Sequence, residues 1–107
     1  MQHTDKSCPV GKVATLVGDP CSLLIVRDLL EGPRRFGELE NSLGSSTRTL
    51  AKKLKVLEHE KIIARKEAPA AAGKDSPACV KYTLTKKGSA LKPTIDAMRV
   101  FGAKYLR

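Results

Sequence analysis

Two short amphipathic segments joined by four residues constrain the fold of this chain more than any other feature. In both segments apolar side chains recur at steps of three or four residues, which is the spacing of one helix face. These side chains are Phe36, Leu39, Leu43, Leu50, Leu54 and Leu57. Only residues 44–47 separate the two stripes, so the helices must pack as neighbours at an angle, and Ser46 or Thr47 can cap the second. The pattern predicts a helix-turn-helix over about residues 36–60.

A hairpin is expected directly after these helices. Ile62 and Ile63 begin an extended run to about Glu67, and a loop with two prolines and a glycine follows. Val80, Tyr82 and Leu84 then alternate with polar or small residues at period two, as in a half-buried strand. Helix, helix and hairpin make up a winged helix-turn-helix, with the wing over about residues 62–85. The expected fold class is therefore α+β, mainly α.

The solvent-exposed face of the predicted second helix carries the residue types that contact DNA bases and phosphates. Arg48 near its start could contact guanine O6 and N7, with neighbouring hydroxyl groups on base edges or phosphate. Lysines and arginines around it would hold the phosphate backbone, and Lys66 and Lys74 in the wing are placed to reach the neighbouring minor groove or backbone. The predicted DNA-binding residues are Arg34, Arg35, Ser46, Thr47, Arg48, Thr49, Lys52, Lys53, Lys55 and Lys74. The alternative is that these charges only keep the helix face solvated, because basic amphipathic helices occur in proteins of several functions.

The overall charge favours a polyanionic partner. Twenty Lys and Arg against eleven Asp and Glu give a net charge of +9, and the pI is about 9.8. A basic membrane-surface protein is the alternative. No apolar run approaches the roughly 20 residues that a span needs, and no secretion signal is recognisable, so a cytoplasmic location without membrane attachment is expected. At 107 residues the chain is expected to form one domain, residues 1–107.

The C-terminal segment is expected to supply a dimer interface. Its apolar stripe, over a helix predicted at about residues 86–106, is too long for the small core to cover completely. The stripe consists of Leu91, Ile95, Met98, Phe101 and Tyr105. Packing on the protein's own second helix is the alternative for part of it. Thr85 is the expected N-cap, and Pro93 is placed to kink the helix. A two-fold dimer would carry its recognition helices about 34 Å apart, on a roughly palindromic operator.

Several motifs resemble a known family. They are Cys8-Pro9-Val10, the run from Leu23 to Leu30, the run from Gly32 to Leu39, Arg48-x-Leu50, Leu54-x-x-Leu57-Glu58 and Tyr82-x-Leu84-Thr85-x-x-Gly88. Together they are similar to the HxlR-type winged-helix transcriptional regulators, relatives of the MarR group. The resemblance implies a homodimer that binds double-stranded operator DNA through a winged helix, with N-terminal and C-terminal dimerisation helices. Where the family usually has a glycine before Ile62, this chain has Lys61, although a left-handed helix cap favours glycine.

Three cysteines in a reducing compartment do not suggest a disulfide framework. The resemblance makes Cys8 the first candidate for a redox or electrophile sensor. Cys21 is the second, because it falls in the first turn of a helix that Asp19 can cap and Pro20 can start, where a thiolate is favoured. Cys21 also replaces an aromatic residue of the family pattern, so a buried and inert thiol is its alternative. Cys79 is expected to be a surface thiol.

The sequence favours no enzyme, metal or cofactor chemistry. It contains no Gly-rich phosphate loop, no nucleophilic triad and no closely spaced cysteine pair. The missing Cys-x-x-Cys motif argues against a thiol-redox enzyme. A winged-helix protein-interaction module is the competing class, since fold alone does not decide function. Such a module would not need cations on both the recognition helix and the wing. An effector, either a small molecule or an oxidant, is possible by the resemblance but unidentified.

Overall fold

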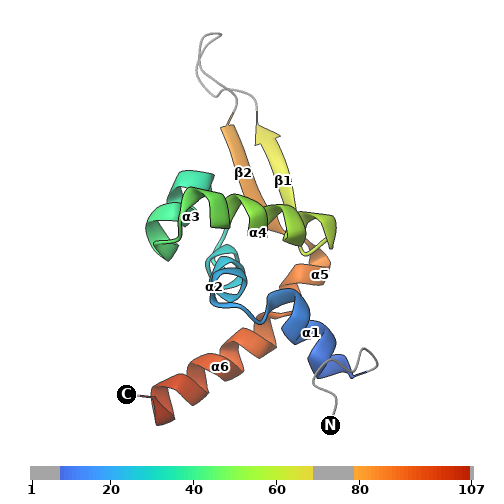
Figure 1. Cartoon of the computed structure of the whole chain (residues 1–107), viewed down its shortest axis with the longest axis vertical. Coiled ribbons are helices and arrows are strands. Elements are labelled where there is room, and N and C mark those ends of the chain that lie inside the picture. Colours follow the sequence, from blue (N-terminus) through green and yellow to red (C-terminus); the bar gives the residue numbers. More distant parts are fainter. Residues whose placement is uncertain (1–7, 69–78, 107) are drawn as a thin grey trace.

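The computed structural model describes residues 8–68 and 79–106, and within them the predicted helix-turn-helix is followed by a β-hairpin, as the sequence indicates. Two helices precede the helix-turn-helix, a β-hairpin follows it, and two more helices complete the described chain (Figure 1). The elements are α1 (Pro9–Val17), α2 (Pro20–Leu29), α3 (Phe36–Leu43), α4 (Thr47–His59), β1 (Ile63–Ala68), β2 (Cys79–Leu84), α5 (Lys86–Ser89) and α6 (Lys92–Tyr105). The mainly helical fold with a two-stranded wing is confirmed.

The core forms where α2, α3 and α4 meet. All three leucines predicted on the inner face of the second helix are buried, and Leu39 of α3 is fully enclosed with them. Phe36 and Leu43 pack at the margin of this core. Helix α2 runs beneath α4 in Figure 1 and contributes the apolar side chains Ile25, Val26 and Leu29. Because the leucine stripe faces inward, the opposite side of α4 faces solvent.

Local hydrogen bonds define where the central helices begin and end. The side chain of Ser46 accepts a bond of 3.1 Å from the backbone N–H of Thr49, which confirms the predicted cap of α4. Asp19 caps α2 in the same way, at 2.9 Å from the N–H of Ser22. Helix α3 ends at Gly44, whose φ of 68° is left-handed and suits glycine. The turn between α3 and α4 is therefore tightly specified by local sequence.

The wing is an antiparallel hairpin attached to the rest of the molecule near its base. Strand β1 pairs with β2 in a register that places Ile63 opposite Leu84. The segment before α3 joins the same sheet, because the backbone N–H of Tyr82 donates to the carbonyl of Arg34 at 2.7 Å and the N–H of Arg34 donates back at 3.0 Å. The segment before α3 and the base of the wing are therefore joined by two backbone hydrogen bonds.

The end of α4 has a cap built around a lysine instead of a glycine. Lys61 adopts φ 65°, the left-handed conformation that the family resemblance implied for this position. The N–H of Ile62 donates to the carbonyl of Leu57 at 2.9 Å, and the N–H of Lys61 donates to that of Glu58 at 3.0 Å, which is the Schellman pattern. A non-glycine residue in this conformation costs about 1–2 kcal/mol, so the surrounding structure must impose it.

The segment after the wing forms two helices instead of the single kinked helix that the sequence suggested. Thr85 is the N-cap of α5, as predicted, because its side chain accepts a bond of 3.0 Å from Gly88 N–H. Helix α5 ends at Ser89, and α6 begins at Lys92 with Pro93 in its first turn. Proline has no N–H to bond the preceding turn but is well suited to a first turn, so Pro93 starts a new helix.

Helices α1 and α6 lie at the end of the molecule opposite the wing (Figure 1). The outer half of α6 extends away from the body of the chain in this view. Among the described residues, no single helix is long and apolar enough to cross a membrane; α1 and α2 reach such a length only together, and the chain bends by 87° between them.

Candidate nucleic-acid interface

Three cations form a stripe on the solvent face of α4. Arg48, Lys52 and Lys55 are spaced four and three residues apart, which places them on one side of the helix. All three are exposed, and they lie opposite the buried leucines. None of the three side chains has an ion-pair partner among the described residues. Their charge is therefore available to an anion that approaches α4.

Lys53 differs from its neighbours on the same helix. Its Nζ lies 3.5 Å from Oδ1 of Asp19, and its side chain is half-buried. The pair joins α4 to the N-terminus of α2. Burial raises the pKa of Asp19, but the hydrogen bonds from Ser22 and the charge of Lys53 outweigh it and hold that pKa below its ordinary value. Lys53 thus helps to hold α4 against α2, and its predicted contact with the DNA phosphate backbone stays a prediction.

The predicted hydroxyl groups are arranged around the first turn of α4. Ser46 donates to the Thr49 hydroxyl at 3.0 Å besides capping the helix. Thr47 donates to the carboxylate of Glu40, and this bond ties α4 to α3. All three hydroxyl-bearing residues are exposed, so they remain accessible at the helix N-terminus. Their internal bonds fix the direction in which this turn of α4 points.

The two arginines before α3 are placed differently. Arg34 folds back on its own loop, donating to the carbonyl oxygen of Pro33 at 3.0 Å and lying 3.4 Å from a carboxylate oxygen of Glu31. Arg35 is exposed at the start of α3. Of the pair, Arg35 is therefore the more accessible to a phosphate, since its side chain forms no ion pair with any residue that the structure describes.

The wing carries the predicted cation Lys66 and a second cation, Lys81, that the sequence pattern did not identify. Lys66 of β1 and Lys81 of β2 are directly opposite each other in the hairpin register, and both are exposed. Directly opposed like charges destabilise a sheet unless an anion lies near them. Lys81 was missed because the register depends on the length of the turn. The predicted wing contact Lys74 lies outside the described residues.

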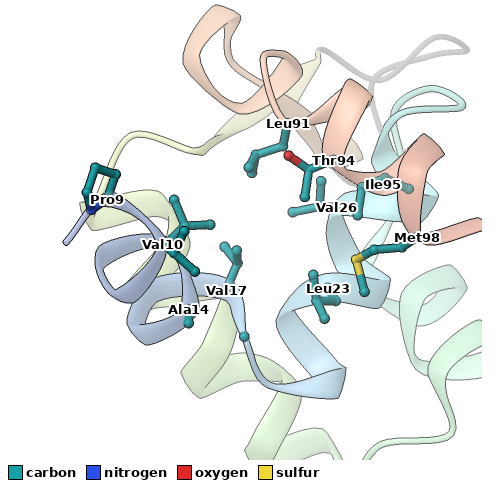
Figure 2. Close-up of a pocket in the computed structure, with 12 residues that line it drawn as sticks. Pro9, Val10, Ala14, Val17, Leu23, Val26, Leu91, Thr94, Ile95 and Met98 are labelled. Carbon is teal, nitrogen blue, oxygen red and sulfur yellow. The ribbon is translucent and has the colours of Figure 1, made fainter. Parts of the chain in front are cut away.

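An apolar surface lies at the other end of the molecule. A groove of about 450 Å³ runs between α1, α2 and α6. Figure 2 shows the side chains that surround it, which include Val10, Val17, Leu23, Val26, Ile95 and Met98. Of the predicted interface residues, Ile95 is buried in the chain's own core and Leu91 packs against that core. Met98, Phe101 and Tyr105 remain 47 to 63% exposed.

The two candidate sensor thiols lie in different surroundings. Cys8 is exposed and precedes the first residue of α1. Cys21 is half-buried in the first turn of α2 and packs against the core, with the Ser45 hydroxyl 3.7 Å from its sulfur. The side chain of Cys79 lies outside the described residues. In the described parts of the chain, no group of three or more metal-ligating side chains gathers in one place.

Comparison with known families matches residues 16–107 to the HxlR-like helix-turn-helix family. Among curated proteins, the chain is 36% identical over 105 residues to the HTH-type transcriptional regulator sll1512 of Synechocystis sp., with 97% of this chain and 74% of that protein covered.

Solved structures of transcriptional regulators share the fold. The reduced form of YodB from Bacillus subtilis has a TM-score of 0.75 and 33% identity, over 94% of this chain and 95% of that one. Its diamide-treated form has a TM-score of 0.71, with 33% identity over 94% and 96% of the two chains. A MarR-family regulator from Porphyromonas gingivalis has a TM-score of 0.83 and 31% identity, over 99% of this chain and all of that one.

Proposed function

The chain belongs to the HxlR-like helix-turn-helix family, and we propose that it regulates transcription as a homodimer bound to a roughly palindromic operator. That it is a transcriptional regulator of the HxlR and MarR type, and not an enzyme, follows from the family and the shared fold. The finer proposal concerns how it reads DNA. Each copy places α4 in a major groove and the wing against the neighbouring backbone or minor groove. Such a regulator acts in the cytoplasm.

The observation that carries this proposal is the unpaired cationic stripe of α4. Arg48 is near the N-terminus of the helix, where side chains reach base edges, and its planar group matches the two acceptors of guanine. Lys52 and Lys55, one and two turns further, suit phosphates. Arg35, Lys66 and Lys81 extend the positive surface beyond α4, to α3 and the wing. A protein-docking module needs no such distribution.

Homodimer formation is supported by the surface of α6. Met98, Phe101 and Tyr105 are too exposed for a single copy to cover them, and the groove between α1 and α6 lies beside them. A second copy with the same surface covers both in a two-fold arrangement. The two α4 helices are then expected about 34 Å apart, one turn of B-DNA. This spacing accounts for the two half-sites of a palindrome.

The test is selection of bound sequences from random duplexes with the purified protein. The expected result is a motif of two inverted half-sites whose centres lie one DNA turn apart. Arg48→Ala should weaken binding by about 1–3 kcal/mol chiefly at one base position of each half-site. The proposal is wrong if no sequence is enriched, or if Arg48→Ala binds the selected duplex as well as the wild type does. Either result would favour the alternative, a winged-helix protein-interaction module.

Redox control through Cys8 is the second part of the proposal. Diamide oxidises thiols, and YodB is a relative whose structure is known both reduced and diamide-treated. Cys8 is exposed beside α1, next to the apolar groove assigned to the dimer. Modification there can rotate one subunit against the other, and the two α4 helices would then no longer match two half-sites on one rigid duplex.

Serine variants test this assignment. Cys8→Ser should bind the operator but ignore peroxide or diamide, while Cys79→Ser should respond like the wild type. Cys21→Ser distinguishes the two interpretations of that thiol. Lower stability with a normal response indicates a packing role, and normal stability without a response indicates a sensing or resolving thiol. A wild type whose DNA affinity never changes with oxidant would remove the redox proposal and leave an unidentified small-molecule effector as the signal.

A further inference from the structure

One large hydrophobic side chain is exposed far from the apolar end of the molecule. The exposed large hydrophobic residues among the described positions are Val10, Val13, Val56, Met98, Val100, Phe101, Tyr105 and Leu106. All but Val56 lie on α1 or α6 or directly after α6. Val56 is 45% exposed and belongs to α4, the helix with the cationic stripe. The dimer contacts proposed for α6 and the groove beside it lie at the opposite end of the molecule and cannot explain Val56.

Val56 lies beside the cationic stripe on the exposed side of α4. It is one turn beyond Lys52 and two turns beyond Thr49, so the three share one side of the helix. From Thr49 to Val56 the helix rises about 10 Å, which is about three base pairs. The opposite flank of α4 turns toward the wing, where Ala51, Lys55 and Glu58 line a cavity with Arg65 and Tyr82. Val56 therefore points away from the wing, beside the cations.

Folding does not account for a valine at this position. Val56 is absent both from the buried core and from the side chains packed against its margin. A β-branched residue on an exposed helix surface is also a weaker helix former than the lysines, glutamate and alanine around it. Isolated exposed valines are common on protein surfaces. This one, however, belongs to a face that a DNA groove would cover.

We propose that Val56 reads the 5-methyl group of a thymine in each half-site, an inference that rests on the proposed DNA binding by α4. In the major groove, the thymine methyl is the one apolar group that base edges present, so an isopropyl side chain there favours thymine over the other bases. Lys52, one turn earlier, holds the adjacent phosphate and so determines how deeply α4 enters the major groove. Val56 is thus a specificity-determining residue in the second half of α4.

The test replaces thymines of the selected operator by deoxyuridine, which removes only the methyl group. One thymine in each half-site should be sensitive, with a loss of roughly three- to fourfold per half-site and about tenfold when both are replaced. On the thymine duplex, Val56→Ala should bind about tenfold more weakly than the wild type, because both copies lose the contact. On the deoxyuridine duplex, the affinity of Val56→Ala should not fall any further. The matched control is Val100→Ala, another exposed valine, which lies on α6; it should keep the full sensitivity of the wild type.

The outcomes separate this inference from the proposed function. If the wild type selects a DNA motif but every thymine can be replaced without loss, Val56 does not read a methyl group. The same holds if Val56→Ala keeps the sensitivity of the wild type. If the wild type selects no motif at all, the DNA-reading function fails and this inference fails with it. Alanine is the better helix former, so loss of folding does not confuse the result.

Discussion

Helices α4 and α6 are nearly equal in length, 13 and 14 residues, but they are held in the molecule very differently. Helix α4 buries three leucines and is capped by Ser46. Helix α6 buries only Ile95 and begins without a side-chain cap. The exposed side of α4 is cationic, whereas that of α6 includes Phe101 and Tyr105, whose rings contact each other 5.1 Å apart between centroids.

The two helices therefore offer different exposed surfaces within one small fold. An isolated helix of this length is marginal in water, and in the single chain α6 is held mainly by the burial of Ile95. Helix α4 is already stabilised by its buried leucines, and its exposed cations remain hydrated in water without a partner. An apolar partner therefore suits α6, and a polyanion suits α4.

The largest expected effect is the dependence of DNA binding on salt. If a dimer makes roughly six to ten phosphate contacts, operator affinity should fall about 10³–10⁵-fold between 50 and 200 mM salt. Lys52→Ala should reduce the slope of log affinity against log salt by about two per dimer, one for each copy. Lys92→Ala removes the same charge from α6 and should leave the slope unchanged. If the two variants gave equal slopes, α4 would contribute no more to phosphate binding than α6, and the proposed difference between the helices would be wrong.

The next effect concerns the apolar face of α6. Met98→Asp should bury an unpaired charge in the dimer seam and raise the dimer dissociation constant about 100-fold or more, roughly 3 kcal/mol. Val100→Asp places the same charge on α6, at a residue outside the proposed seam, and should leave the dimer intact. Sedimentation equilibrium measures both. A monomeric wild type, or a Met98→Asp variant that stays dimeric, would count against α6 as the interface. Ile95 is unsuitable for this test because the core buries it.

A smaller effect tests how α4 is anchored to α2. Asp19→Ala should cost about 1 kcal/mol in the free energy of unfolding, because the cap of α2 is lost. Asp19→Asn keeps the cap and removes only the charge facing Lys53, so it should cost less. Thermal or urea unfolding measures both variants. An Asn variant as unstable as the Ala variant would assign the main role to the ion pair.

The same pair predicts a pH dependence. The folded pKa of Asp19 lies below the ordinary value of 3.8, so its charge stabilises the fold fully above that value. This contribution is lost as the pH falls through the lower folded pKa. The difference in stability between the wild type and Asp19→Asn should therefore shrink in acid. A difference that does not change with pH would exclude the charge as its source.

The smallest effect lies at the end of α4. Lys61→Gly should stabilise the protein by about 0.5–1 kcal/mol, since glycine avoids the strain of φ 65° but loses more entropy on folding. Gly44→Ala is the reciprocal control, because Gly44 has φ 68° and nothing within 4 Å of an added Cβ. It should destabilise by a similar amount. If Lys61→Gly lowers the unfolding midpoint, the lysine side chain contributes more than its backbone costs.

Local sequence was sufficient for the elements of the winged helix. The leucine stripes, the Ser46 cap and the alternation in β2 all follow from residues within a few places of one another, whereas the left-handed position of Lys61 was implied by the family resemblance. Periodicity identifies an apolar face because helices and strands repeat at fixed steps. The same rule explains why Arg48, Lys52 and Lys55 could be placed together before the fold was known.

Only the tertiary structure decided which side chains remain free. Lys53 and Lys52 are neighbours in the sequence, but Lys53 meets Asp19, whereas Lys52 has no ion-pair partner in the part of the chain that the structure describes. Ile95 and Met98 belong to one apolar stripe, but the first enters the core and the second stays half-exposed. The helical repeat determines the direction in which each side chain projects from the helix axis. What lies in that direction depends on how distant segments pack, and no local pattern contains that information.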